Sequence, residues 1–483
     1  MTDIAANVPS PRAAWGAEIS ATLALAWPIV LTNLCQTGLA TTDVVMMGWL
    51  GPDALAAGAL AVNLNFAFLI FAIGVVTATA PLMAIELGRN RHSVRDVRRT
   101  MRQGCWAAIA ITLPIWAVLW HAETIFLWLG QQPAIAHHAA SYLHTFQWQF
   151  LPFLFYVILR NFVSALERPL SALWIGGSAL VVNAFLVWTL MFGHFGLPAL
   201  GLPGAGIATT LTNIYMAGGL ALLISRDRRF RRYHLFGHFW RPDWPRFGAI
   251  WRVGLPIAVT LAFEATIFNA ATFVMGIISA SALAAHAIAM QIPSFTFMVP
   301  LGLSTAATVR VGRAYGARDI VGIARAGWAA YGTAFVYACG TATFILVFRH
   351  QLVGLFLDWS KPADAVVATL AASYLVWAGI FQLVDSAQVV LDVLTDQREK
   401  VVVGLNASGQ VREFQLRTRL RFKLRTPRGK ELIPETELLQ QRDISFNESA
   451  VLAKESEEDL LYREMQTDLV QQLMRRLAAV KSL

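Results

Sequence analysis

The sequence predicts an all-α polytopic membrane protein with two lobes of parallel repeats, followed by a small C-terminal α+β fragment. The first observation is charge: residues 1–390 hold 23 Lys and Arg and 15 Asp and Glu, whereas residues 391–483 hold 16 and 15 in a quarter of that length. The second is a set of ten apolar runs in the first segment, and the third is an internal repeat. So few charges exclude an ordinary cytosolic enzyme for most of the chain.

The apolar runs are long enough to cross a hydrocarbon core, which takes about 20 helical residues. Arginines gather after the second, fourth, sixth and eighth runs, and the opposite connections hold only Arg349 and Lys361. By the positive-inside rule, the N-terminus and residue 391 then lie in the cytoplasm. These basic stretches are short loops, so they indicate topology rather than a nucleic-acid partner, and no removable signal peptide is expected. The ten runs are centred in residues 22–46, 55–83, 104–121, 141–165, 171–193, 204–224, 255–278, 284–308, 326–348 and 366–390.

The internal repeat relates residues 28–88 to residues 256–316. A shift of 228 residues, without a gap, gives 15 identities in 61 positions, among them Pro28 with Pro256 and Gly88 with Gly316. Six runs separate the copies, so both copies have the same orientation in the membrane. Parallel repeats form two lobes around a central cleft in transporters. We therefore divide the chain into an N-terminal cytoplasmic segment, a first lobe, an inter-lobe loop, a second lobe and a C-terminal fragment, with bounds 1–19, 20–225, 226–253, 254–390 and 391–483.

The pattern changes at residue 391. Residues 411–424 alternate polar and apolar side chains, which is typical of a half-buried strand. A turn at residues 427–429, a second strand over 431–444 and a helix over 457–480 complete a small α+β fragment.

Three carboxylates lie deep in apolar runs: Asp43, Glu264 and Asp385. A charge at the bilayer midplane costs about 2.5–3.5 kcal/mol, so an intramembrane acid indicates a functional site. Two alternatives stay open. Asp43 lies late in its run and can reach water at the interface, and Glu264 and Asp385 can be structural hydrogen-bond acceptors. If Glu264 and Asp385 are neighbours within one lobe, the pair suits binding of a proton or a cation.

Other polar residues in the runs include Gln36 and Asn183, which are candidates for a polar cleft or for hydrogen bonds between helices. Three cysteines, Cys35, Cys105 and Cys339, have no paired spacing, so they are predicted to be packing residues rather than a disulfide or a metal site. The sequence offers no convincing nucleophile, metal set or cofactor motif. We therefore predict that the chain is not an enzyme.

Residues 20–390 resemble the multidrug and toxic compound extrusion (MATE) family, NorM-type branch, in the segments LALAWPIVLTNLCQTGLATTDVVMMGWLG, GLPIAVTLAFEATIF, HAIAMQIPSFTFMVPLGLSTAATVRVGRAYGA and FQLVDSAQVV. The resemblance implies twelve helices in two six-helix lobes, no cofactor, and export of small organic cations driven by Na⁺ or H⁺.

Residue by residue, Asp43 matches the family's first-lobe coupling aspartate, and Glu264 and Asp385 match its second-lobe coupling carboxylates, where Na⁺ is a possible ligand. Asn183 matches a polar position on the fifth helix. Four residues later Val187 stands where many relatives carry a second polar group. The family's eleventh and twelfth helices have no counterpart in this sequence.

The segments LDVLTDQREK and GQVREFQLRTRLRFKL resemble the C-terminal half of the LPS-assembly lipoprotein LptE, which plugs the LPS-inserting barrel of the outer membrane. The seam falls between Val390 and Leu391. The sequence thus predicts a chimera: a cation-coupled drug antiporter of the bacterial inner membrane, impaired by the loss of two helices and joined to an LptE-like fragment. The alternative is an LPS-assembly protein with the helices as its anchor, in which case the LPS-transport barrel is a partner.

Overall fold

The fold is described from a computed structural model. It describes residues 11–445, except 91–92, 236, 238–239, 355–361, 387–389, 406–410 and 426–430, together with residues 461, 464, 465, 468 and 472. For residues 380–445 only the backbone is described. The chain divides into two compact units, Met1–Gly379 and Ile380–Leu483.

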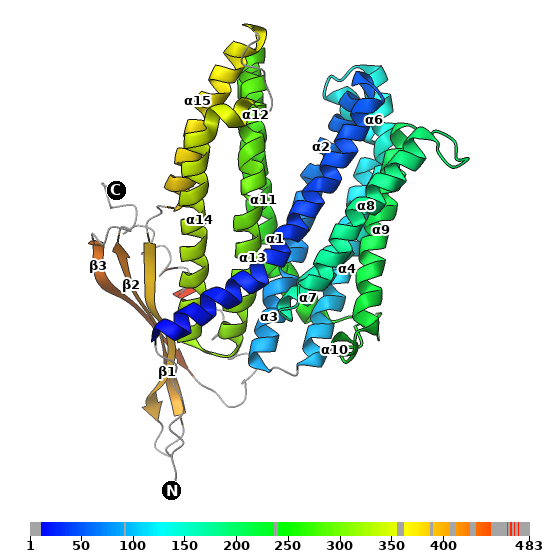
Figure 1. Ribbon diagram of the computed structural model, residues 1–483. Coiled ribbons are helices and arrows are strands. Elements are labelled where there is room, and N and C mark those ends of the chain that lie inside the picture. The colour runs from blue at the N-terminus through cyan, green and yellow to red at the C-terminus, as the bar shows by residue number, and fades with distance from the viewer. Residues whose placement is uncertain are drawn as a thin grey trace. The chain divides into compact units, whose positions relative to one another are not determined.

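The first lobe of the helical unit is a bundle in which apolar runs supply the membrane-spanning length (Figure 1). Its first helix packs on α8, α8 packs on α9, and α9 packs in turn on α6 and α7. Two further helices, α2 and α4, close the bundle against α7. The elements are α1 (Pro11–Trp49), α2 (Pro52–Thr77), α3 (Thr79–Arg89), α4 (Val94–Leu119), α5 (Ala122–Trp128), α6 (Pro133–Phe146), the 3-10 turn η1 (Gln147–Gln149), α7 (Phe150–Ala165), α8 (Leu170–Phe192), α9 (Leu202–Arg226) and α10 (Arg228–Arg231).

The second lobe repeats the beginning of the first. Prolines set the helix breaks in both: Pro81 and Pro300 are each the third residue of a helix, where a missing N–H costs no intrahelical hydrogen bond. The second span of each lobe is therefore divided into two helices, at Ala78 in the first lobe and at Phe297 in the second. The elements are α11 (Trp244–Ile278), α12 (Ala280–Thr296), α13 (Met298–Gly316), α14 (Ile320–Gly354) and α15 (Pro362–Ser386).

The predicted all-α membrane fold is confirmed, with one difference in the fourth run. Among the described residues, eight helical segments are long and apolar enough to cross a membrane, and Val366–Gly379 is a shorter apolar helix. The fourth run is absent from these because it forms α6, η1 and α7, and neither α-helix alone has 18 residues. A change to 3-10 geometry at Gln147–Gln149 interrupts what the hydropathy pattern predicts as one helix.

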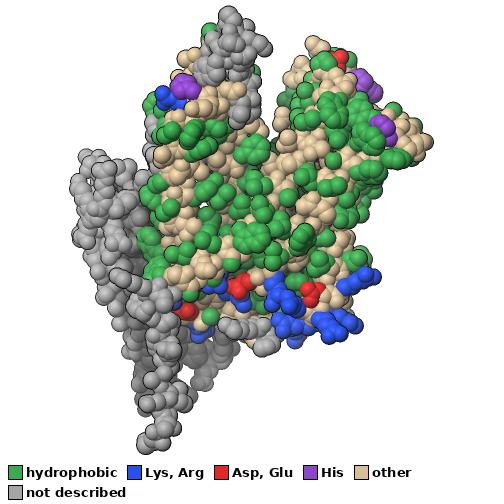
Figure 2. Space-filling model, viewed as in Figure 1, with side chains coloured by type: hydrophobic (Ala, Val, Ile, Leu, Met, Phe, Trp, Pro, Cys, Tyr) green, Lys and Arg blue, Asp and Glu red, His purple; other side chains and the backbone are tan. Residues whose placement is uncertain are grey.

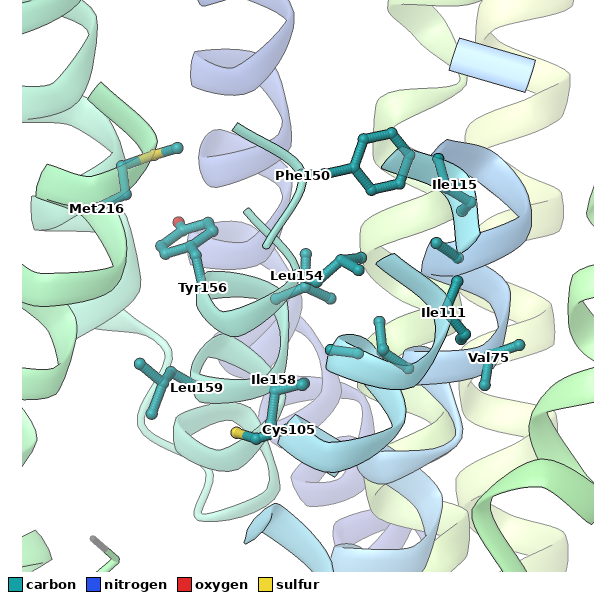
Figure 3. Close-up of a cluster of buried hydrophobic side chains, with 14 of the residues drawn as sticks. Val75, Cys105, Ile111, Ile115, Phe150, Leu154, Tyr156, Ile158, Leu159 and Met216 are labelled. Carbon is teal, nitrogen blue, oxygen red and sulfur yellow. The ribbon is translucent and has the colours of Figure 1, made fainter. Parts of the chain in front are cut away.

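The core of the first lobe lies between α2, α4, α7 and α9 (Figure 3). Val75, Ile111, Leu154 and Met216, one from each of these helices, are almost completely buried. Cys105 belongs to the same cluster as a free, buried thiol, as expected of a packing residue. Burial of these apolar side chains against one another fixes the positions of the helices that carry the polar residues described below.

The C-terminal unit contains a three-stranded antiparallel sheet in the order β1-β2-β3. Strands β2 (Val411–Arg425) and β3 (Glu431–Ser445) coincide with the two predicted strands. Strand β1 (Val390–Leu405) lies outside the predicted strands, because consecutive charged and polar residues at 395–400 interrupt any alternation of apolar side chains.

The register of the sheet pairs Phe414 of β2 with Val402 of β1 and with Ile444 of β3. Apolar positions of the three strands therefore lie side by side at this point of the sheet. The predicted turn at 427–429 lies outside the described residues, as does most of the predicted helix over 457–480.

Candidate functional site

Asp43 lies near the end of α1 and is buried among α1, α8 and α9, with 7% of its surface exposed. Asn183 of α8 donates an Nδ2 hydrogen to Asp43 Oδ1 at 2.6 Å. Thr209 of α9 donates its hydroxyl hydrogen to Asp43 Oδ2 at 3.0 Å. Both carboxylate oxygens thus have donors, so the carboxylate is satisfied inside the lobe and not in water at the interface.

The hydrogen bonds continue along α9. The Thr212 hydroxyl donates to Asn183 Oδ1 at 3.0 Å, and Asn213 Nδ2 donates to Gln149 Oε1 at 2.9 Å. Thr209, Thr212 and Asn213 are three and four residues apart, so they share one face of the helix. The sequence reasoning missed these three residues. Their spacing within an apolar run is the signal that could have found them.

Each of the two threonine hydroxyls has a second acceptor within reach. Thr209 Oγ1 lies 3.0 Å from the carbonyl oxygen of Ala205, and Thr212 Oγ1 lies 2.9 Å from that of Ala208. A hydroxyl has one hydrogen, which can point either to the side-chain acceptor or to the backbone acceptor. The network can therefore exchange hydrogen bonds by rotation of two hydroxyl groups, without movement of a helix.

Val187, one turn after Asn183 on α8, is fully buried. It presents no polar atom to the lobe, so α9 supplies the other hydrogen bond to Asp43.

Gln36 belongs to a different cluster. Arg160 of α7 donates from Nη1 to Asn33 Oδ1 at 3.1 Å and to Gln36 Oε1 at 3.4 Å, so the guanidinium bridges α7 and α1. The two predicted cleft residues, Gln36 and Asn183, thus have different partners. Under the shift of 228 residues, Gln36 is equivalent to Glu264, so the two lobes carry different polar groups at this position.

The two second-lobe carboxylates lie on different helices. Glu264 lies in α11 and is exposed. Asp385 lies in the last turn of α15, where only the backbone is described, and it falls in the other compact unit. Pairing of Glu264 with Asp385 stays a prediction.

Over the residues with described side chains, no three His, Cys, Asp or Glu come together as a metal site. What the helical unit holds instead is a buried carboxylate with its own hydrogen-bond network, inside one of two lobes of equal orientation. An intramembrane carboxylate in a fold of parallel membrane repeats is typical of a secondary transporter.

Comparison with known proteins identifies the family. The MatE family profile matches residues 28–189 and 256–409, and the chain belongs to this family of MATE transporters, which are not enzymes. The probable multidrug resistance protein NorM of Mesorhizobium japonicum is 54% identical over 392 residues, which cover 81% of this chain and 84% of that protein. The protein of the same name from Brucella suis is 50% identical over 376 residues, covering 78% and 80%.

Solved structures show the same fold. The crystal structure of the eukaryotic MATE transporter AtDTX14 has a TM-score of 0.68 at 19% identity, covering 77% of this chain and 82% of that one. A mutant of the Vibrio cholerae MATE transporter VcmN has a TM-score of 0.68 at 17% identity, covering 77% and 83%. At these identities the likeness concerns the fold alone.

The C-terminal segment matches a second family. The lipopolysaccharide-assembly (LptE) profile covers residues 361–477, which overlaps the MatE match over residues 361–409. The overlap contains strand β1 and the predicted seam between Val390 and Leu391. The chain therefore joins sequences similar to two unrelated families, as predicted.

Proposed function

We propose that the chain is a cation-coupled antiporter that exports small organic cations across the inner membrane, with Asp43 as a coupling group of the first lobe. The observation that carries the proposal is the burial of Asp43 between donors from two helices of a membrane lobe. Such a carboxylate can exchange a cation during the transport cycle. The names of the NorM relatives support drugs as the exported class.

We further propose that the ion exchanged at Asp43 is a proton. A bound Na⁺ would need several oxygen atoms around one point, but Val187 adds no oxygen and Asn183 turns its Nδ2 hydrogen, not its oxygen, toward Asp43. When Asp43 takes up a proton on Oδ2, the new O–H can donate to Thr209 Oγ1. The hydrogen of Thr209 then turns to the carbonyl oxygen of Ala205, so donor and acceptor exchange roles and every hydrogen has an acceptor.

Protonation has a direct effect on an organic cation. It removes the negative charge of Asp43 from a region of low dielectric constant, where that charge attracts a cation most strongly. Uptake of a proton from the outside therefore favours the conformation that releases the drug.

The test is efflux of a cationic dye from proteoliposomes under an imposed pH gradient without Na⁺. We expect Asp43→Asn, which is isosteric and cannot exchange a proton, to abolish the pH-driven component. The full chain should show this component above the rate of empty liposomes. Retention of pH-driven efflux by folded Asp43→Asn would refute the assignment.

For the second lobe, we propose that Glu264 and Asp385 bind the coupling ion, either H⁺ or Na⁺, and that this lobe works poorly in the chain as given. In the apolar stretches of its spans, 11–22% of residues are buried inside the protein, against 28–56% in the spans of the first lobe. Two further helices, which the MATE resemblance implies, would cover such faces. Without them small residues lose packing contacts, and rigid-body rocking of the lobe is weakened.

The proposed orientation places the N-terminus and the inter-lobe loop in the cytoplasm. Figure 2 supports this orientation, since Lys and Arg side chains gather at one end of the helical unit. The corresponding division is residues 1–19, 20–225, 226–253, 254–390 and 391–483.

A second candidate function is LPS assembly, favoured by the match of residues 361–477 to the lipopolysaccharide-assembly family. In that case the helices anchor a tail that meets the LPS-transport barrel in the periplasm. Protease added to the periplasmic side of spheroplasts distinguishes the two candidates. A tail cleaved from that side supports LPS assembly, and a protected tail in an intact membrane excludes it.

A further inference from the structure

The two lobes meet at the end of the helical unit where the Arg side chains gather, and a hollow separates them at the other end (Figure 2). The helices that meet are α1, α2, α3 and α4 of the first lobe and α11, α13 and α14 of the second, with the most extensive contacts between α2 and α11, α3 and α13, and α1 and α13. At several points the backbones approach so closely that no side chain fits. A methyl group on Gly88 of α3 would overlap the carbonyl oxygen of Arg313, and one on Gly316 of α13 would overlap that of Ile85.

These two contacts are equivalent under the internal repeat. Adding 228 to Ile85 and Gly88 gives Arg313 and Gly316, so each partner in one contact has its repeat equivalent in the other.

A second pair of contacts behaves in the same way. A methyl group on Gly74 would lie 2.7 Å from the backbone nitrogen of Ala258, and one on Gly302 would lie 3.1 Å from that of Val30. Val30 and Ala258 are again 228 residues apart, as are Gly74 and Gly302.

In one case, a residue contacts its own equivalent in the other copy of the repeat. A methyl group on Gly312 would lie 3.0 Å from Cβ of Ala84, and 84 plus 228 is 312. Only a residue beside a two-fold axis contacts its own copy, so a pseudo-two-fold axis passes through this interface. The close approaches are therefore built into the repeat and do not arise from chance packing.

Ion pairs flank the glycine contacts on one side of the axis. Arg310 of α13 donates to both carboxylate oxygens of Glu18 on α1, from Nε at 2.9 Å and from Nη2 at 2.7 Å. Arg310 Nη1 also lies 3.0 Å from Glu167, whose other oxygen lies 2.6 Å from Arg313 Nη1. Each of these pairs joins one lobe to the other.

A second group of ion pairs also flanks the glycine contacts. Here the second lobe's helix α11 supplies the arginine, whereas in the first group α1 supplies an acid. Arg246 near the start of α11 lies ten residues before the second repeat segment, as Glu18 lies ten residues before the first. Arg246 Nη2 lies 2.7 Å from Asp96 and 3.4 Å from Glu86, both in the first lobe. These two positions, on α1 and on α11, thus carry opposite charges, and each reaches across to helices of the other lobe.

We propose that these residues form a gate that closes the central cleft on the cytoplasmic side. The glycines allow the two backbones to touch, and the flanking ion pairs hold the lobes together in the outward-open conformation. The ion-pair side chains are partly exposed, so water replaces their partners when the lobes separate and opening stays reversible. The proposal rests on the proposed function in that the lobes are its moving parts.

The test measures the distance between the lobes by double electron–electron resonance. Spin labels go on Arg95→Cys in α4 and Ile320→Cys in α14, whose side chains are exposed and are not among those that form the gate contacts, in a full chain with Cys35, Cys105 and Cys339 replaced. We expect Gly88→Ala and Gly316→Ala each to raise the ratio of long to short distances about tenfold, because the added methyl overlaps a backbone atom. The control is Gly327→Ala on α14, where an added methyl meets nothing within 4 Å.

A second variant removes charge without adding atoms. Glu167→Gln should shift the distances in the same direction by about two- to fivefold, and it decides the matter if the glycine variants do not fold. Its control is Glu123→Gln, whose exposed pair with His137 lies outside the lobe interface. Unchanged distances in folded Gly88→Ala and Glu167→Gln would overturn the gate. The labels report conformation without substrate, so an absence of efflux bears only on the proposed function.

Discussion

Replacing Thr209 by Val tests the proton assignment at Asp43 most directly. The change keeps the shape of the side chain and removes the hydroxyl that lies 3.0 Å from Asp43 Oδ2. The ionised carboxylate loses a hydrogen bond to a charged group, about 1.5–3 kcal/mol, whereas the protonated form loses a neutral one, about 0.5–1.5 kcal/mol. The difference, about 1–1.5 kcal/mol, favours the protonated form.

A tenfold increase in the proton affinity of Asp43 corresponds to about 1.4 kcal/mol, which is close to this difference. The pH at half-maximal dye efflux should therefore rise by about one unit in Thr209→Val. The assay is dye efflux from proteoliposomes at a series of pH values without Na⁺. Thr209→Ser, which keeps the hydroxyl, should retain the parent profile. So should Thr210→Val, since the Thr210 hydroxyl donates to the carbonyl oxygen of Thr145 at 3.2 Å and not to Asp43.

A profile that does not move in Thr209→Val would refute the argument. A rise in the Na⁺ concentration needed for efflux, in place of a pH shift, would show that the Thr209 hydroxyl is a Na⁺ ligand. In that case the proton assignment is wrong.

Three further predictions concern the second lobe and the tail. Glu264→Gln and Asp385→Asn should each abolish ion-coupled dye efflux at unchanged expression, and unchanged efflux in both would contradict their role. Residues 391–483 expressed alone should melt broadly in circular dichroism, because three strands without the other half of an LptE-like domain bury too little surface; a sharp two-state melt would show the opposite. Replacing the tail by two final helices of a MATE relative should restore resistance to a drug-sensitive strain, and equal resistance from both chains would refute the claim of impairment.

The membrane fold was predictable because hydropathy and charge act locally along the chain. The ten runs and the repeat lie in the sequence itself, and so does the cost of placing Asp43 in an apolar run. The partners of Asp43 were only partly predictable. Asn183 is 140 residues away and Thr209 is 166, so their contact depends on how α1, α8 and α9 pack.

The gate shows a different limit of sequence reasoning. The identities of Gly74 with Gly302 and of Gly88 with Gly316 are visible in the sequence repeat. The repeat alone does not show, however, that its two copies contact each other in the folded protein. That information comes from the axis relating the lobes, which the contact of Ala84 with Gly312 reveals.

Contact across a two-fold axis also explains which features the two repeats share. Gly74 and Gly88 meet the backbone of the second lobe, and their equivalents Gly302 and Gly316 meet the backbone of the first, so a glycine is kept at both positions of each pair. Polar groups inside a lobe face no such requirement. Asp43 has Ala271 as its repeat equivalent, and Gln36 has Glu264, so these interior positions have diverged while the glycine pairs Gly74/Gly302 and Gly88/Gly316 have not.

The gate and the Asp43 site are both separate from the missing part of the second lobe. The gate contacts of the second lobe come from α11 and α13, and Asp43 lies within the first lobe, so neither depends on the two missing helices. Adding those helices should then raise dye efflux while leaving the distance between labels at Arg95→Cys and Ile320→Cys unchanged in the outward-open state. If the added helices shorten that distance, the second lobe is displaced in the chain as given. The impairment would then arise at the gate and not at Glu264 and Asp385.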